Sequence, residues 1–270
     1  MEGEVYAMSS LFTAMVFWAM TKWYEQADEP YANRWIVLIS FLMGLSIGVH
    51  LLNLLAIPAL VFMFYYRRRE DGEYSVKEFI KMALVSIVIL GLLVFILIPY
   101  LPKLAAYVDL FFVNSLGLPV NSGAAFFLVA MLVLCFFALI KFYDRGKVFW
   151  TTVTLCFTTI LIGFSLFSIV IIRSSVMTPT NENQPDNAFS LVRYLSREQY
   201  GSTPLLYGQY YGSPYDDLKV TKYWTLVGGK YRKVNGPVEA KYSARGKMLF
   251  PRMWSNQDDR FIKFYETSAN

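Results

Sequence analysis

The chain contains few of the residues that build metal centres and hydrolytic triads. Its 270 residues include a single histidine, His50, and two cysteines, Cys135 and Cys156. A zinc site needs several His or Cys ligands at short spacings, and none occurs here, so we expect no metal site. A Ser-His-Asp hydrolase would have to rely on His50. Both cysteines lie within apolar runs, where a thiol behaves as a small hydrophobic side chain, so they say nothing about the redox compartment.

A signal peptide and a nucleic-acid-binding surface are also missing. The chain opens Met1-Glu2-Gly3-Glu4, which is acidic where a signal peptide needs positive charge. We therefore expect this sequence to begin inside a longer protein. The formal net charge is +5. Its basic residues cluster between apolar runs and form no aromatic-interleaved face, so we expect no nucleic-acid partner.

Long apolar runs are what the chain has in excess. Hydrophobic residues make up 56% of it, against about 45–50% in soluble proteins, and they are concentrated before residue 173. A membrane helix needs about 20 apolar residues. We predict a polytopic transmembrane helical bundle over residues 1–173, with about six spans. The expected spans are residues 5–23, 35–49, 51–66, 79–100, 124–142 and 149–172.

The run 35–66 decides the number of spans. A single helix of this length would measure about 48 Å, whereas the hydrocarbon core is about 30 Å thick. The run also contains Gly44, Gly48, His50, Asn53 and Pro58. We therefore expect a break near Gly48–His50 and two short helices that meet at one membrane face, although a single helix is the alternative.

Charge orients this topology. The basic segments 22–34, 67–69 and 141–147 fall on one side, and Lys103 is the only basic residue in the inter-helix loops of the other side. Cytoplasmic loops are enriched in Lys and Arg, so the basic side is expected to be cytoplasmic. The N-terminus and all residues after 173 are then extracytoplasmic.

Two further segments are expected to be ordered outside the membrane. In the loop 101–123, the stretch 104–113 is amphipathic and is expected to lie in the interface, followed by ordered turns. Residues 174–270 are expected to form a small, truncated α+β region. Its helix, about 188–200, is capped by Asp186 or Asn187, and a two-residue Gly228-Gly229 turn joins a hairpin of 223–227 and 230–234.

Several sequence strings match one family. They occur in the same order as in that family and are spread over nearly the whole length of this chain. They are Glu4-Val-Tyr-Ala7, Gly44-Leu-Ser-Ile-Gly-Val-His-Leu-Leu-Asn-Leu-Leu55, Val113-Asn-Ser-Leu-Gly-Leu-Pro-Val-Asn-Ser-Gly123, Ile172-Arg-Ser174, Tyr194-Leu-Ser-Arg-Glu-Gln-Tyr-Gly201, Pro204-Leu-Leu-Tyr-Gly-Gln-Tyr-Tyr211 and Phe250-Pro-Arg-Met-Trp254. Together they resemble a Bacteroidetes family of large membrane proteins in the GT-C glycosyltransferase superfamily, related to eukaryotic protein O-mannosyltransferases.

The resemblance implies a GT-C-like enzyme of the bacterial inner membrane with a periplasmic C-terminal region. Such an enzyme transfers a sugar from a polyprenyl-phosphate donor to a protein or glycan acceptor, here as protein O-glycosylation. Its acidic catalytic loop follows the first membrane helix of the family and is expected upstream of Met1. The catalytic residues are therefore unknown, this fragment alone is expected to be inactive, and no cofactor or divalent metal is assigned.

The predicted topology brings several polar residues to the extracytoplasmic side. The candidates for donor or substrate binding are Glu4, Tyr6, His50, Asn53, Asn114, Asn121, Arg173 and Arg197. Each has a structural alternative. Glu4 lines a pocket or stabilises a helix N-terminus. His50 binds the donor phosphate, conducts protons or ties two helices together, and Asn53 serves as a helix contact or a ligand.

The arginines carry the same ambiguity. Arg173 closes the last span on the side where the charge rule disfavours it. We therefore expect it to pair with a lipid phosphate or to reach the headgroups. Arg193 and Arg197 share a helix face that is either a solvated or docking surface or part of the site.

Two other functional classes remain open. A transporter or flippase of lipid-linked glycans would use ionisable residues or broken helices at mid-membrane. A non-catalytic envelope assembly protein would use its outer region as a binding module. An intact acidic loop upstream would favour the enzyme over both.

Overall fold

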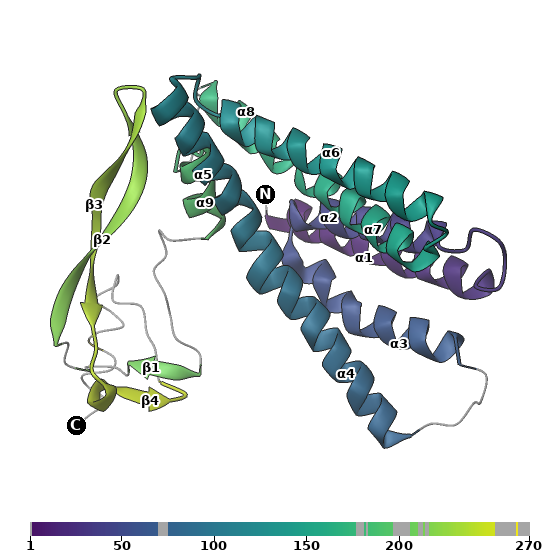
Figure 1. Cartoon of the computed structure of the whole chain (residues 1–270). Helices are drawn as coiled ribbons and strands as arrows, with labels where there is room; N and C mark the ends of the chain where they lie inside the picture. Colours follow the sequence, from purple (N-terminus) through teal and green to yellow (C-terminus); the bar gives the residue numbers. More distant parts are fainter. Residues whose placement is uncertain are drawn as a thin grey trace. The chain divides into compact units, whose positions relative to one another are not determined.

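The computed structural model describes residues 2–69, 75–176, 181, 183–196, 206–209, 213, 216–251 and 263. The chain forms two compact units. Met1–Leu195 is helical, and Ser196–Asn270 carries the strands (Figure 1). Arg197, one of the candidate ligands, lies outside the described residues.

The helical unit begins with two helices and a third that is interrupted. Helix α1 spans Glu2–Glu25, α2 spans Arg34–Ile47, and the 3₁₀ segment η1 (Leu51–Ala56) leads into α3 (Ile57–Arg67). The predicted break near Gly48–His50 is confirmed. His50 has extended backbone angles, and its side chain accepts a hydrogen bond from the Leu52 N–H, so it caps η1.

The next helix is far longer than expected. Helix α4 (Val76–Gly91), the π-helical stretch η2 (Leu92–Leu97) and α5 (Ile98–Leu116) form one continuous helix of 41 residues, about 62 Å long. The prediction of a loop from residue 101, with 104–113 as a separate interfacial segment, is therefore wrong up to Leu116. The helix ends where Gly117 adopts a positive φ of 68°.

Two prolines are accommodated within this helix. Pro99 stands in the first turn of α5 and Pro102 lies inside it. A proline lacks the N–H that would reach the carbonyl four residues back, and the π-helical stretch changes the bonding pattern just before them. Pro102, Ala106, Asp109 and Val113 form one buried stripe. Packing of this stripe keeps α5 helical.

Two more long helices and a short one complete the helical unit. Helix α6 spans Ser122–Asp144. Helix α7 (Val148–Phe164) continues through a two-residue turn into α8 (Phe167–Ser175). Helix α9 (Ala188–Leu195) is capped by Asn187, whose Oδ1 accepts from the N–H groups of Phe189 and Ser190, as one of the two predicted caps. Phe189 packs edge-on against Tyr107 of α5 at 5.7 Å, which places α9 in the helical unit.

The chain is mainly helical and has the features of a membrane protein. Within the described residues, three helices are long and apolar enough to cross a bilayer: Val76–Leu116, Ser122–Asp144 and Val148–Ser175. The expected count of six spans is not confirmed. Helix α1 is not in this group, and the apolar helices on either side of the Gly48–His50 break are shorter than a span.

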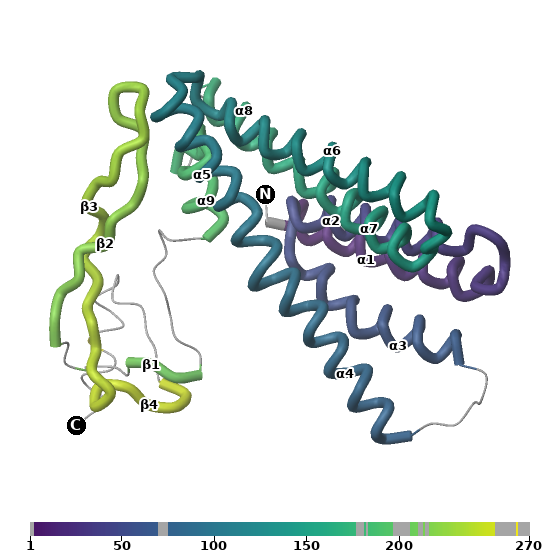
Figure 2. Tube along the Cα trace, in the orientation of Figure 1, coloured from purple at the N-terminus to yellow at the C-terminus, as the bar shows by residue number. Residues whose placement is uncertain are grey.

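Two glycines allow α2 and α7 to pack closely (Figure 2). A Cβ on Gly44 would lie 2.7 Å from the Ile160 carbonyl oxygen, and one on Gly163 would lie 2.5 Å from the Leu45 nitrogen. Small residues are what let membrane helices approach so closely. Asn33 bonds Thr152 at the start of the same two helices, so α2 and α7 run in the same direction.

The basic segments gather at one end of the helical unit. Arg67, at the end of α3, donates to the Tyr24 carbonyl and pairs with Asp28 at 2.5 Å, beyond the end of α1. The Asn33–Thr152 bond places the start of α2 beside the start of α7. We name this the basic end, and its membrane side stays a prediction. The opposite end, with the start of α1, the Gly48–His50 break, the start of α6 and α8, is the polar end.

The second unit contains two antiparallel strand pairs. Strand β1 (Tyr207–Gln209) pairs with β4 (Lys247–Leu249), which follows a 3₁₀ turn, η4 (Ala244–Gly246). Strand β2 (Asp217–Val227) pairs with β3 (Lys230–Lys241). The predicted hairpin is confirmed and is longer than expected. Gly228 and Gly229 both have positive φ, as its two-residue turn requires.

The glycine contact yields a stability prediction. Gly163→Ala places a Cβ against the backbone of α2 and is expected to destabilise the helical unit by about 1–3 kcal/mol, the usual range for overpacking. Gly91→Ala is the matched control, because its Cβ would meet only the Phe95 side chain at 4.0 Å. Thermal unfolding in detergent should show a lower midpoint for Gly163→Ala alone. Equal midpoints for the two variants would contradict the close contact.

Candidate functional site

Tyr6 and His50 meet at the polar end. Their ring centroids lie 5.4 Å apart, at an angle of 50°. Nδ1 of His50 accepts the Leu52 N–H at 3.1 Å. A neutral imidazole that accepts through Nδ1 carries its proton on Nε2. The capping bond therefore leaves Nε2–H as a hydrogen-bond donor for a ligand.

Asn53 fixes the segment that follows His50. It is fully buried, and its Nδ2 donates to Ser46 Oγ at 3.0 Å and approaches the Met43 sulfur at 3.4 Å. These contacts join η1 to α2 and hold the position of His50. Glu4 is exposed in the first turns of α1, close in sequence to Tyr6.

Asp109 connects α5 to the start of α6. It is fully buried, and its carboxylate accepts the backbone N–H groups of Asn121 (3.1 Å), Gly123 (2.8 Å) and Ala124 (3.4 Å). The first N–H groups of a helix have no partner within it and carry partial positive charge, so a carboxylate stabilises them. Gly123 is required for this approach, because a Cβ there would lie 2.5 Å from the Asp109 Cα.

Asp109 was not among the residues predicted from the sequence. The available signal was a single acidic residue within the apolar stretch 104–113, just before the turns rich in asparagine and glycine. This stretch was predicted to lie in the membrane interface, where an aspartate needs no partner. Asn114, a predicted site residue, is half-buried near the end of α5.

Asn121 joins a third element to this contact. It has a positive φ of 69°, and its Nδ2 donates to the Asp186 carbonyl at 3.0 Å. Asp186 directly precedes the Asn187 cap of α9. The Asp109–Asn121 contacts therefore hold α5, α6 and α9 together.

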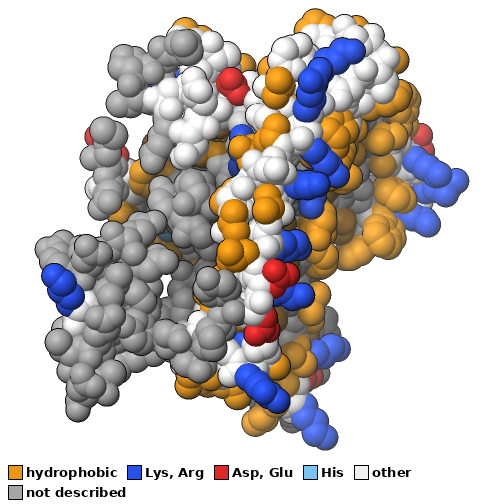
Figure 3. All heavy atoms as spheres, turned by 90° about the vertical axis from the view of Figure 1, so that its left-hand side faces the viewer, with side chains coloured by type: hydrophobic (Ala, Val, Ile, Leu, Met, Phe, Trp, Pro, Cys, Tyr) orange, Lys and Arg blue, Asp and Glu red, His pale blue; other side chains and the backbone are white. Residues whose placement is uncertain are grey.

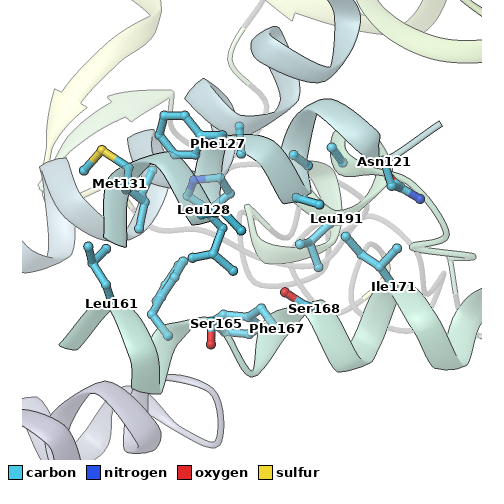
Figure 4. A pocket seen from close by; sticks show the side chains of 18 of the residues that line it. Asn121, Phe127, Leu128, Met131, Leu161, Ser165, Phe167, Ser168, Ile171 and Leu191 are labelled. Atoms are coloured by element: carbon cyan, nitrogen blue, oxygen red, sulfur yellow. The ribbon is translucent and has the colours of Figure 1, made fainter. Parts of the chain in front are cut away.

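These helices, together with α7 and α8, line an apolar pocket of about 340 Å³ (Figure 4). Such a volume lies at the lower end of the range for small-molecule sites. Figure 4 shows Asn121 and Ile171 at one end of the pocket and Met131 and Leu161 at the other. Its polar lining side chains are Asn121, Ser165 and Ser168. The remaining lining residues are Leu101, Pro102, Ala105, Ala124, Ala125, Phe127, Leu128, Val129, Phe164, Phe167, Ile172, Ala188 and Leu191.

The pocket adjoins the core that supports His50. Phe164 belongs to the buried cluster that also contains Leu54 of η1, and Leu101 and Phe167 pack against that cluster. The Tyr6–His50 pair and the pocket therefore both border the core of the helical unit. The structure brings Tyr6, His50 and Asn53 together in one group and Asn121 with the pocket in another.

Arg173 follows the pocket directly in sequence. Ile172 lines the pocket, and Arg173 comes next, in the last turn of α8. Its side chain is exposed, and within the described part of the chain it makes no ion pair. The same described residues contain no group of three or more His, Cys, Asp or Glu side chains placed to hold a metal ion.

The Asp109 contacts predict a specific loss of stability. Asp109→Asn removes the charge and turns an N–H₂ group towards backbone donors, so we expect a cost of about 1–3 kcal/mol, the range for buried groups left without a partner. Asp144→Asn is the control, because this exposed aspartate ends α6, the helix whose first N–H groups bond Asp109. Unfolding midpoints in detergent should fall for Asp109→Asn only. An unchanged midpoint would show that the carboxylate does not hold α6.

Two comparisons with protein families bear on this arrangement. Residues 1–73 match the family described as the protein O-mannosyl-transferase TMEM260 N-terminal domain. Residues 201–270 match a family of unknown function, DUF8416. No curated protein and no solved structure matches the chain. The first match contains Glu4, Tyr6, His50 and Asn53 and supports the link to O-mannosyltransferases, so over its first helices this membrane protein is similar to a protein O-mannosyltransferase.

Proposed function

We propose that this chain is part of an integral-membrane glycosyltransferase that transfers a sugar from a polyprenyl-phosphate donor to a protein acceptor. The match of residues 1–73 to the O-mannosyltransferase domain carries this proposal. The three apolar helices support it, because a lipid-linked donor requires an enzyme in the bilayer. The proposal includes membership of the GT-C superfamily in a Bacteroidetes-type inner membrane, with the reaction on the extracytoplasmic face.

The pocket is suited to part of the donor's isoprenoid chain. Apolar side chains from α5, α6, α7, α8 and α9 surround it, and its few polar groups include Asn121 at one end. An isoprenoid chain has no hydrogen-bonding groups, so an apolar lining costs it nothing. We assign the chain to the Met131–Leu161 end and the headgroup to the Asn121–Ile171 end.

We assign the donor phosphate to Arg173. It stands one residue beyond the pocket lining and is exposed. A guanidinium can bind phosphate through two parallel hydrogen bonds, which gives both affinity and orientation. A chain held in the pocket would then bring its phosphate to the polar end.

His50 is assigned to the same headgroup. Sugar transfer breaks the bond between sugar C1 and the phosphate oxygen, while the acceptor hydroxyl oxygen bonds to C1 and loses its proton to a base. The leaving phosphate gains charge in this step, and a donor such as Nε2–H of His50 stabilises it. Tyr6 and Asn53 position His50, and exposed Glu4 lies near them in α1.

The proposal predicts that Arg173 distinguishes a phosphate from an alcohol. In the complete native protein, Arg173→Ala should weaken binding of polyprenyl phosphate at least tenfold, because it removes a charge-assisted contact. Binding of the free polyprenol, which has no phosphate, should change little. Native mass spectrometry in detergent measures both ligands.

The matched control is Arg145→Ala, an exposed arginine after α6 at the basic end. It should leave both affinities unchanged. Equal weakening of phosphate and alcohol by Arg173→Ala would contradict the phosphate assignment. A lipid-linked glycan flippase would bind these lipids too. The complete native protein and its Arg173→Ala variant are therefore also assayed for transfer of the sugar to a peptide acceptor. No transfer by the complete protein would reject the enzyme.

A second variant tests the pocket itself. Ala105→Phe fills the cavity from α5 and should weaken polyprenyl phosphate and polyprenol alike, because both need room for the chain. The control is Ala14→Phe, at an exposed position on α1. We expect at least a tenfold loss for Ala105→Phe, measured by the same binding assay. Unchanged binding of both lipids would place the chain elsewhere.

A further inference from the structure

The β2–β3 hairpin has a strongly uneven distribution of charge. Six basic side chains and two acidic ones lie on its two strands, and all eight are exposed. Near its open end, the strand register places Asp217 opposite Lys241 and Lys219 opposite Glu239. Opposite charges in directly facing positions balance each other. The open end is therefore close to neutral.

The half of the hairpin that ends at the turn has no such balance. Its basic residues are Lys222, Lys230, Arg232 and Lys233, and the sequence from 218 to 238 contains no Asp or Glu. Their cross-strand neighbours are Asn235, Val227, Thr225 and Trp224. Within the described residues only Lys233 has an electrostatic contact among these four, over the Trp224 ring at 5.2 Å. We call these four residues the cationic tip.

The strand geometry puts the cationic tip on both faces of the hairpin. Alternate residues of a strand point to opposite faces. Lys222 faces the same side as Trp224 and its partner Lys233, whereas Arg232 and Lys230 face the other side. In the space-filling view of Figure 3, Lys and Arg side chains are spaced along the surface that faces the viewer. A surface charged on both faces suits an end-on approach into a layer of anions better than flat docking on one partner.

We propose that the cationic tip binds the anionic headgroups of the membrane in which the chain is embedded. The last apolar helix ends at Ser175 and β2 begins at Asp217 in the same chain, so connectivity keeps headgroups at high effective concentration. Lys and Arg near an anionic leaflet each raise binding about fivefold. Trp224 and Tyr223 lie between these cations, and such rings are enriched at the membrane–water interface. Val227, 42% exposed beside the turn, adds an apolar contact.

This docking does not depend on sugar transfer. It assigns a lipid-binding role to a part of the chain whose family match carries no function. A negative docking experiment would therefore leave the proposed sugar transfer untouched, and a negative transfer assay would leave the proposed docking untouched.

The experiment uses the whole chain in lipid nanodiscs. An environment-sensitive fluorophore is attached to Val227→Cys in a background with Cys135→Ala and Cys156→Ala. Discs contain phosphatidylcholine alone or with added phosphatidylglycerol, and headgroup spin labels quench a docked fluorophore. We expect quenching in the anionic discs and its loss at high salt, because screening shortens the reach of these charges.

Two variants make the test specific. Lys230→Gln with Arg232→Gln removes two cations and should lower the ratio of docked to undocked hairpin about 25-fold. Exchanging Lys219 and Glu239 keeps both the composition and the facing pair, so it should leave docking unchanged. The salt titration of the otherwise unmodified labelled chain gives an answer even if a variant fails to fold. Equal quenching in neutral and anionic discs would overturn the proposal, as would quenching that appears only when an acidic peptide is added.

Discussion

The carboxylate of Asp109 is the contact on which the polar end depends. It is buried, and it accepts three backbone N–H groups at the start of α6. Without it, those N–H groups would have no hydrogen-bond partner. An unpaired backbone donor is costly both in the protein interior and in lipid. The same contact positions Asn121, whose side chain donates a hydrogen bond to the Asp186 carbonyl just before α9. The pocket exists because α5, α6 and α9 are held at this one point.

A second constraint acts between α2 and α7. Gly44 and Gly163 bring the backbones of α2 and α7 together, so a helix of 14 residues is held against a longer one. The chain can then leave α2 at Gly48 and turn at His50 without exposing unpaired backbone groups to lipid. His50 itself supplies the first cap of the next segment. One side chain thus both completes the break and remains available for a ligand.

Sequence reasoning succeeded where a local pattern was sufficient. The break at Gly48–His50 followed from length and glycine content, and the hairpin followed from Gly228-Gly229. The prediction of a loop from residue 101 was wrong, because residues 101–116 are helical. There, burial of α5 against α6 and α9 outweighs the local signals. Asp109 was missed for the same reason, because its partners lie 12 or more residues further along the chain and only the folded helices bring them near.

The helix from Val76 to Leu116 ties the depth of the pocket to the lipid around it. At about 62 Å it is roughly twice the thickness of a hydrocarbon core. A helix of this length must tilt or extend into the headgroup region, and α5, its far end, carries the pocket wall formed by Leu101, Pro102 and Ala105. A thinner bilayer would leave more of α5 in water, and a thicker one would draw it inward. Bilayer thickness thereby becomes a physical variable that sets how deep the pocket wall formed by α5 lies.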